Sequence, residues 1–333
     1  MDSMDRLEEV EEANIDKAFI DACPPGIRIV FNSGTAEHSP QTIADALLGL
    51  VDRVHTESDV ILQPLRLILV TANLAEAANF WNRELGLSEA GVSAGAVGKH
   101  ISWGNDLESA RSIVIIHAGI AIGLLSGLSI ATTSVIHEFG HVYDDLARGL
   151  QIGFSQPGLS PNLNDWPRIC AHCAEITWSE FAAESVAAAY MTADDLQELM
   201  ANDPVHLAGI HTQLRQLVQS WNLGQLDFPS LWSQAVTNVS DLFANLGRAA
   251  ARFPFATNGA QSRAGFVDTA GAAAPWKPVV DQIFRELDAL AHTAYSQWVA
   301  EPFRGLGDLI AAGFNAAGFF PIPCGQNLRV NVR

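Results

Sequence analysis

Hydrophobic and polar residues follow two different periods along the chain. Before residue 130, short runs rich in β-branched residues alternate with amphipathic segments, which is typical of mixed strand and helix structure. From residue 130 onward, nearly every long segment has helical periodicity. The predicted strands are 26–34, 65–73, 96–106 and 112–120, the last two as a hairpin, and the predicted helices are 39–57, 74–85, 130–148, 174–191, 192–222, 231–251 and 278–299.

This pattern predicts an α+β fold with a mixed α/β N-terminal lobe and a mostly helical C-terminal lobe. We expect an acidic N-terminal arm over 1–24, a core over 25–195, and a helical region over 196–333 packed on that core. Three stretches rich in small or turn-forming residues are predicted loops: 91–98, 151–168 and 254–276.

An uncharged stretch of 25 residues, Ser112–Ile136, is long enough for a membrane span. It has no basic or aromatic belt beside it, and several hydroxyl side chains lie within it. We therefore predict a buried strand over 112–120, helix-breaking residues over Gly123–Gly127, and a helix that Ser129 caps. The strand SIVIIHAGI is expected to form the sheet edge on which an extended peptide docks, with His117 packed or at the rim.

Charge excludes a general nucleic-acid binder. The 333 residues contain 19 Lys and Arg against 37 Asp and Glu, which gives a net charge of −18. A phosphate-binding surface needs a basic face, and an acidic surface also repels anionic lipid. The first residues are acidic where a signal peptide is basic and apolar, so we expect a cytoplasmic protein, with secretion by another route as the alternative.

The motif HEFGH at His137–His141 carries the chemistry. On a helix, residues i and i+4 share one face, so the imidazoles of His137 and His141 can reach one zinc ion. Glu138 can then act as general base on the zinc-bound water. One Zn²⁺ per chain is the predicted cofactor.

A catalytic zinc site needs a third protein ligand and one open position. The helix TWSEFAAESVAAAY offers Glu180 and Glu184 at i and i+4, among alanines that allow close packing. We assign Glu180 as the third ligand and Glu184 as an acceptor that orients a ligating imidazole. Glu175 as ligand and an exchange of the Glu180 and Glu184 roles are the alternatives.

The motifs HEFGHVYDDLA and SEFAAESVAA resemble those of the gluzincin metallopeptidases, especially the lethal-factor catalytic domain, and of the ImmA/IrrE peptidases. The resemblance covers about 112–190. It implies a zincin fold, a metalloprotease (hydrolase) activity, zinc ligands at His137, His141 and Glu180, and Glu138 as base. The tyrosine that the lethal-factor group places just before its third ligand is missing here.

Without that tyrosine, the residue that stabilises the transition state stays open. His172 and Tyr190 are the named candidates, and Tyr143, His206 and His211 are further ones. Asp144 and Asp145 follow His141, and either one of them bonds a ligand histidine or both solvate the end of the helix. We favour the second interpretation.

The cysteines do not indicate a disulfide scaffold, because four cysteines are few for this length. Cys170 and Cys173 form a CxxC without the βαβ context of a redox motif. A second, structural zinc site that also uses Cys23 and Cys324 is a minor alternative.

Taken together, the residues predict a zinc metalloendopeptidase of the gluzincin type with its metal in a cleft between the two lobes. The substrate is a protein or peptide, and we expect neither nucleic acid nor a membrane as partner. The rival prediction is a non-catalytic, zinc-stabilised interaction protein, and a membrane-embedded metalloprotease is a third. The oligomeric state stays open.

Overall fold

A computed structural model describes residues 17–22, 26–32, 39–86, 96–153, 162–270, 276–298, 301–324 and 327–333. The chain divides into two compact units, Met1–Ser160 and Pro161–Arg333. The core predicted over 25–195 therefore draws on both units. Most of the predicted acidic arm and of the predicted loop at 91–98 lies outside the described residues.

The first unit contains a four-stranded mixed sheet with the strand order β1-β2-β4-β3. Three of its strands are parallel to one another, and β3 runs antiparallel to β4, as the predicted hairpin requires. The strands span Arg28–Asn32 (β1), Leu65–Thr71 (β2), Gly98–Trp103 (β3) and Arg111–His117 (β4). All four predicted strands are confirmed, with ends that differ by a few residues.

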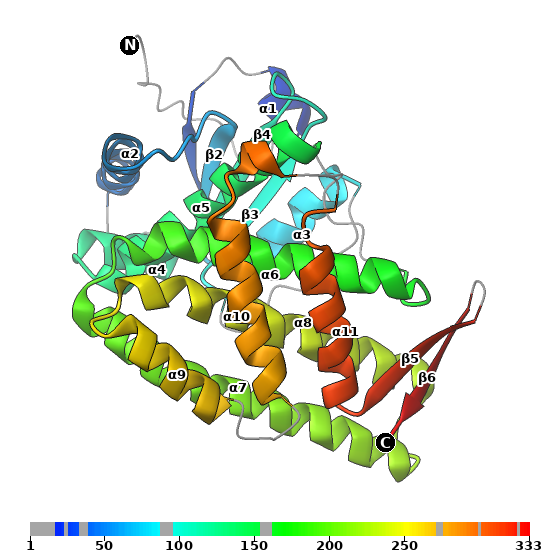
Figure 1. Ribbon diagram of the computed structural model, residues 1–333. Helices are drawn as coiled ribbons and strands as arrows, with labels where there is room; N and C mark the ends of the chain where they lie inside the picture. Colours follow the sequence, from blue (N-terminus) through cyan, green and yellow to red (C-terminus); the bar gives the residue numbers. More distant parts are fainter. Residues whose placement is uncertain are drawn as a thin grey trace. The chain divides into compact units, whose positions relative to one another are not determined.

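Helices cover both faces of this sheet (Figure 1). One face packs on α3, and its core includes Trp81, Ile113 and Ile115. The other face packs on α4 and α5, and α2 packs on these two helices. The helices span Lys17–Ala22 (α1), Pro40–Glu57 (α2), Leu74–Glu84 (α3), Ala118–Leu125 (α4) and Ser129–Ile152 (α5). Burial on both faces explains the continuous apolar run of β4.

Three expectations for this unit are wrong: the sheet edge at SIVIIHAGI, the helix-breaking role of Gly123, and the cap at Ser129. The strand SIVIIHAGI is not a sheet edge, because β2 and β3 flank β4 and take its backbone hydrogen-bonding groups. The strand also ends at His117, whose Nδ1 accepts a hydrogen bond from the Gly119 amide and so caps α4. The glycines at 119 and 123 thus lie inside a helix. Ser129 begins α5 without a side-chain cap.

The uncharged stretch 112–136 is divided among β4, α4 and the first turns of α5. Helix α4 is only eight residues long, and α5 continues past this stretch into charged residues. Within the part of the chain that the structure describes, no helix is both long enough and apolar enough to cross a membrane.

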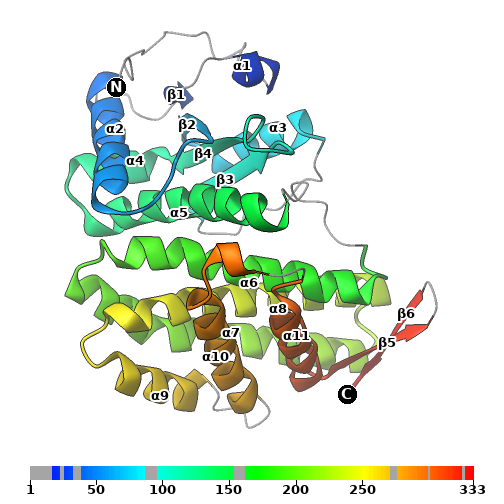
Figure 2. The same ribbon diagram turned by 45° about the horizontal axis from the view of Figure 1, so that its top comes forward.

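The second unit is a helical bundle with one small hairpin. Helices α10 and α11 lie side by side and cross α6 and α8 (Figures 1 and 2). Its core includes Trp178, Trp232, Phe243 and Phe314. The elements span Trp166–Ala188 (α6), Ala193–Asn222 (α7), Phe228–Arg252 (α8), Phe253–Phe255 (η2), Gly259–Ala270 (α9), Lys277–Ala291 (α10), Tyr295–Gln297 (η3) and Arg304–Ala316 (α11).

Helix α6 begins eight residues earlier than the predicted segment 174–191. Asp165 is its N-cap and accepts a hydrogen bond from the Arg168 amide, and Pro167 stands in the first turn, where a proline fits. Part of the predicted loop 151–168 is therefore helical at both ends, because α5 also extends to Ile152. Of the residues between α5 and α6, those at 154–161 lie outside the described residues.

Helices α6 and α8 approach each other closely at Gly247. A Cβ atom added there would lie 2.4 Å from the Thr177 carbonyl oxygen of α6. Only a glycine therefore fits at this contact. The close approach brings the C-terminal turns of α8 against the part of α6 that carries two glutamates.

The last third of the chain holds four helices and strands that the sequence pattern did not predict, and one of them is α11. Helix α9 forms inside the predicted loop 254–276. Strands β5 (Phe319–Cys324) and β6 (Asn327–Val332) form an antiparallel hairpin. Pro321 and Pro323 of β5 argue against a strand in a sheet interior, but each strand of a two-stranded sheet is an edge and tolerates proline.

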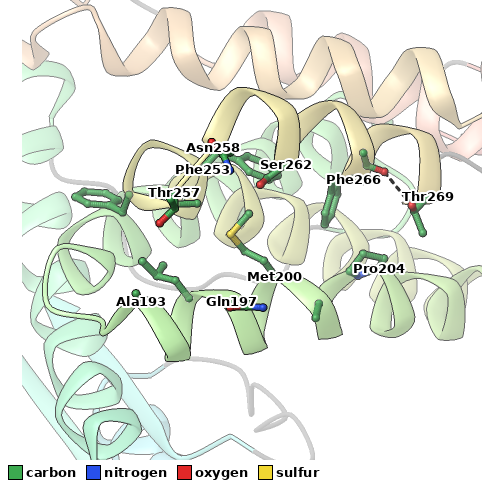
Figure 3. A pocket seen from close by; sticks show the side chains of 15 residues that line it. Ala193, Gln197, Met200, Pro204, Phe253, Thr257, Asn258, Ser262, Phe266 and Thr269 are labelled. Atoms are coloured by element: carbon green, nitrogen blue, oxygen red, sulfur yellow. Dashed lines mark hydrogen bonds between the residues drawn. The ribbon is translucent and has the colours of Figure 1, made fainter.

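The second unit also encloses a cavity of about 540 Å³ between α7 and the η2–α9 segment. Figure 3 shows neutral side chains around it, among them Gln197, Met200, Asn258 and Phe266. The described residues that line it include no charged side chain.

Candidate metal centre

The two histidines of HEFGH lie on one face of α5. The ring centroids of His137 and His141 are 4.8 Å apart, with the rings nearly perpendicular. Both residues are half-buried, whereas Phe139 and Gly140 between them face the core. The amphipathic period of α5 therefore turns the imidazoles away from the sheet core and toward a partly accessible side of the helix.

Glu138 packs against β3 at Gly98. A Cβ atom on Gly98 would lie 2.7 Å from Glu138 Oε1 and 2.8 Å from its Cγ. Glu138 is only 9% exposed. The missing side chain at position 98 thus makes the space that the carboxylate occupies.

A network of charged and polar groups continues from the motif along α5. Asp145 accepts hydrogen bonds from Ser102 of β3 and from Arg148, and Arg148 also donates to Asp144 over 2.8 Å. Asp144 is fully buried. The expectation that the two aspartates solvate the end of the helix is therefore wrong.

These contacts set the charge of Asp145. Burial alone raises the pKa of this carboxyl, but Arg148, His100, Ser102 and His141 together hold the pKa below its ordinary value. The carboxylate is therefore anionic at neutral pH.

His100 of β3 stacks on His141, with ring centroids 5.9 Å apart and an interplanar angle of 12°. Its Nδ1 lies 3.7 Å from Asp145 Oδ2. Burial lowers the pKa of His100 to about 4, although Asp145 acts in the opposite direction. The ring is neutral at pH 7.

The predicted third ligand, Glu180, lies on α6 and pairs with Arg248 of α8. Arg248 Nε donates to Glu180 Oε2 over 2.6 Å. The Glu180 side chain is 17% exposed. This ion pair favours the charged carboxylate, which is the form that a metal ligand needs.

One turn further along, Glu184 pairs with Arg252 of α8 over 2.5 Å. Arg252 also donates to both carboxylate oxygens of Asp203 on α7, over 2.8 and 2.7 Å. Burial raises the pKa of Asp203, and Arg252 acts against this shift. Two ion pairs, Glu180–Arg248 and Glu184–Arg252, therefore connect α6 and α8, and they lie one helical turn apart.

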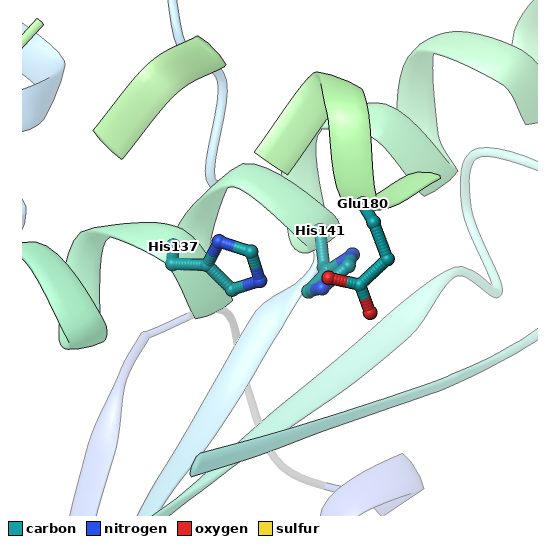
Figure 4. Close-up of side chains that lie close together, drawn as sticks. All are labelled: His137, His141 and Glu180. Carbon is teal, nitrogen blue, oxygen red and sulfur yellow. The ribbon is translucent and has the colours of Figure 1, made fainter. Parts of the chain in front are cut away.

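His137, His141 and Glu180 form a group that could hold a metal ion. One ligand atom from each residue lies within 4.8 Å of the others. Figure 4 draws the three side chains together. The two imidazoles and the one carboxylate are the residues that the sequence assigned as ligands.

The alternative ligands and the candidate transition-state residues lie elsewhere. His172 precedes Glu180 by eight residues, a rise of about 12 Å along α6. Tyr190 follows the end of α6, where its amide bonds the Ala187 carbonyl. Neither residue, nor Glu175, belongs to the group of three. The roles assigned to His172, Tyr190 and Glu184 stay predictions.

The other candidates named from sequence lie on two helices. Tyr143 is part of α5, and His206 and His211 are part of α7. His211 is buried and packs edge-on against Trp276. Its surroundings belong to the core of the second unit.

Cys170 and Cys173 are free thiols buried on α6. Burial raises the pKa of Cys170 to about 12 and that of Cys173 to about 11. Both are therefore protonated at neutral pH, which does not suit a metal-binding or redox thiolate. Cys324 lies exposed on β5, and Cys23 lies outside the described residues.

Comparison with family models, curated proteins and solved structures finds no match to this chain. The interpretation of the site therefore rests on its own residues. Sequence reasoning did not find the groups that surround the candidate ligands, namely Gly98, His100, Asp203, Arg248 and Arg252. They carry no motif, and only their positions in the fold bring them to the site.

Proposed function

We propose that this chain is a zinc-dependent metallopeptidase of the zincin type that hydrolyses peptide bonds in a protein or peptide substrate. His137, His141 and Glu180 hold the zinc ion, and Glu138 is the general base. The observation that carries the proposal is the group of three ligand atoms within 4.8 Å of one another. Two imidazoles and a carboxylate are a donor set of catalytic zinc sites, which keep a fourth position open.

The donor set fits zinc in kind. Imidazole nitrogens and carboxylate oxygens are ligands that Zn²⁺ takes in proteins, at bond lengths of roughly 2.0–2.2 Å. Arg248 donates a hydrogen bond to Glu180 Oε2, and this contact favours the anionic carboxylate that a metal ligand needs.

When bound, zinc lowers the pKa of a water molecule and polarises the carbonyl of the scissile bond. Glu138 takes a proton from the attacking water and passes it to the leaving amine. The contact with Gly98 keeps the Glu138 side chain beside its neighbouring ligands on α5. Glu180 and the two imidazoles complete the coordination.

An extended substrate can add to the sheet at β3, because β3 is the terminal strand in the order β1-β2-β4-β3. The same strand contacts α5 at the HEFGH motif. We assign the peptide-docking edge to β3 in place of β4. The substrate's backbone would then run beside the residues that act on it.

Elemental analysis of the purified protein is the first test. We expect about one zinc per chain in the wild type and none in His137→Ala or Glu180→Gln. His55→Ala is the matched control, because His55 is an exposed histidine of α2 in the first unit. A folded wild type that binds no zinc after reconstitution refutes the proposal.

Turnover separates the peptidase from a non-catalytic zinc protein. We expect the wild type to cleave a mixed peptide library and Glu138→Gln to keep its zinc without cleaving. Cleavage must also stop when a chelator is added. Zinc binding without cleavage of any peptide would favour the zinc-stabilised interaction protein.

A further inference from the structure

One face of β3 meets one face of α5 residue by residue. Successive side chains of a strand point to opposite faces, so Gly98, His100 and Ser102 share the face turned toward α5. Ile101 and Trp103 belong to the opposite face and pack in the core with α3. The strand rises about 6.6 Å per two residues, close to one helical turn. Because the rise per two strand residues and the rise per helical turn are similar, three successive residues on this face of β3 can each lie beside a residue of α5.

Each of the three β3 residues contacts a different group on α5. Gly98 makes room for Glu138, His100 stacks on His141, and Ser102 donates a hydrogen bond to Asp145. The α5 residues at 138, 141 and 145 recur at helical spacing and lie on or beside the face of the candidate ligands.

His100 is the central contact of this series, and packing dominates its interactions. Its side chain is 8% exposed, and its ring lies nearly parallel to that of His141. Nδ1 is 3.7 Å from Asp145 Oδ2, which is beyond hydrogen-bond distance, and the buried Nε2 has no hydrogen-bond partner among the residues that the structure describes. The contact that His100 makes with His141 is therefore one of ring against ring.

We propose that His100 is a positioning residue that fixes the orientation of the His141 imidazole for metal binding. The inference rests on the proposed function, because it assigns His141 as a zinc ligand. An unrestrained histidine must lose side-chain freedom when it binds a metal. A ring packed flat against it removes part of that cost in advance. The side-chain freedom that His141 regains when this ring is removed should lower metal affinity by about 5- to 10-fold.

Zinc affinity of the full chain tests this role, measured by competition with a chelator of known affinity. We expect His100→Ala to bind zinc about 5- to 10-fold more weakly. His100→Phe keeps a flat ring and is expected to stay within about threefold of the wild type. His55→Ala is the control for loss of a histidine away from the site. If His100→Ala does not fold, His100→Leu, which has bulk but no flat ring, takes its place.

Cobalt substitution supplies a second readout that loss of stability alone does not change. The visible absorption of bound Co²⁺ reports on the geometry of its ligands. We expect His100→Ala to shift the spectrum and His100→Phe to retain it.

The outcomes separate the two proposals. A wild type without zinc refutes the proposed function itself. A wild type that binds zinc, together with folded His100→Ala of equal affinity and unchanged Co²⁺ spectrum, overturns the positioning role alone. Binding by His100→Phe as weak as that of His100→Ala also overturns it, because the ring nitrogens and not the stacked surface would then be responsible.

Discussion

The contact between α6 and α8 at Gly247 predicts that a glycine-to-alanine substitution inside a helix destabilises the protein, although such a substitution usually stabilises it. Replacing a glycine inside a helix by alanine normally stabilises the helix by about 0.5–1 kcal/mol. Gly209, an exposed glycine inside α7 with no atom within 4 Å of an added Cβ, should follow this rule. Gly247→Ala should do the opposite.

The structure gives the magnitude for Gly247. The added Cβ would lie 2.4 Å from the Thr177 carbonyl oxygen, about 1 Å closer than ordinary contact. The obstacle is helix backbone, which cannot rotate away, so the cost lies near the upper end of the 1–3 kcal/mol range for overpacking, at about 3 kcal/mol. The gain in helix propensity offsets about 1 kcal/mol of this. We expect a net loss of about 2 kcal/mol.

Thermal unfolding of the full chain, followed by tryptophan fluorescence, measures both variants. Six of the eight tryptophans lie in the second unit, so the signal reports mainly on that unit. For a unit of this size, a loss of 2 kcal/mol lowers Tm by about 4–8 °C. Gly209→Ala should raise Tm slightly. If Gly247→Ala is as stable as Gly209→Ala, the two helices do not approach as closely as described.

Three further predictions concern buried polar groups. Arg252→Met leaves the buried Glu184 and the half-buried Asp203 without their cation, and we expect the free energy of unfolding in urea to fall by about 3 kcal/mol; a loss below 1 kcal/mol would contradict the ion network. Burial lowers the pKa of His211 to about 4, so the native state favours the neutral ring. The contribution of the neutral His211 ring to stability is fully present above pH 6.5 and is lost as the pH falls toward 4. Between pH 7 and 5 the wild type should therefore lose about 1 kcal/mol more than His211→Phe, half of what a fully dry ring would lose; equal losses would refute this assignment. Alkylation of the native protein at pH 8, mapped by mass spectrometry, should label Cys324 while the raised pKa values protect Cys170 and Cys173; labelling of the buried pair at the same rate would show that these thiols are accessible.

Local patterns predicted much of the secondary structure. The β-branched runs gave the strands β2 and β4, and the helical period gave α2, α3, α5, α7 and α8 with small errors at their ends. These features depend on neighbours within a few residues, which the sequence contains directly. The same reasoning failed at α4 and α9, where glycines indicated loops. Burial of their apolar residues in the tertiary structure overrides the weak local preference against helix.

The order of the strands in the sheet could not be predicted from the sequence pattern. The apolar run of β4 is consistent with any buried strand, and only its pairing with both β2 and β3 shows that it is internal. The hairpin of β5 and β6 was missed because prolines usually argue against strands, and their tolerance depends on the open edges of this sheet.

The sequence by itself determined the candidate metal ligands and the candidate base, because HEFGH places His137, Glu138 and His141 by the fixed geometry of one helix. It also pointed to Glu180, from the spacing of two glutamates on another helix. Only the tertiary structure decided what surrounds them: β3 supplies Gly98 and His100, and α8 supplies the arginines that pair with the glutamates. The physical reason is that a helix fixes distances between residues a few positions apart, whereas contacts between distant segments depend on how the elements pack.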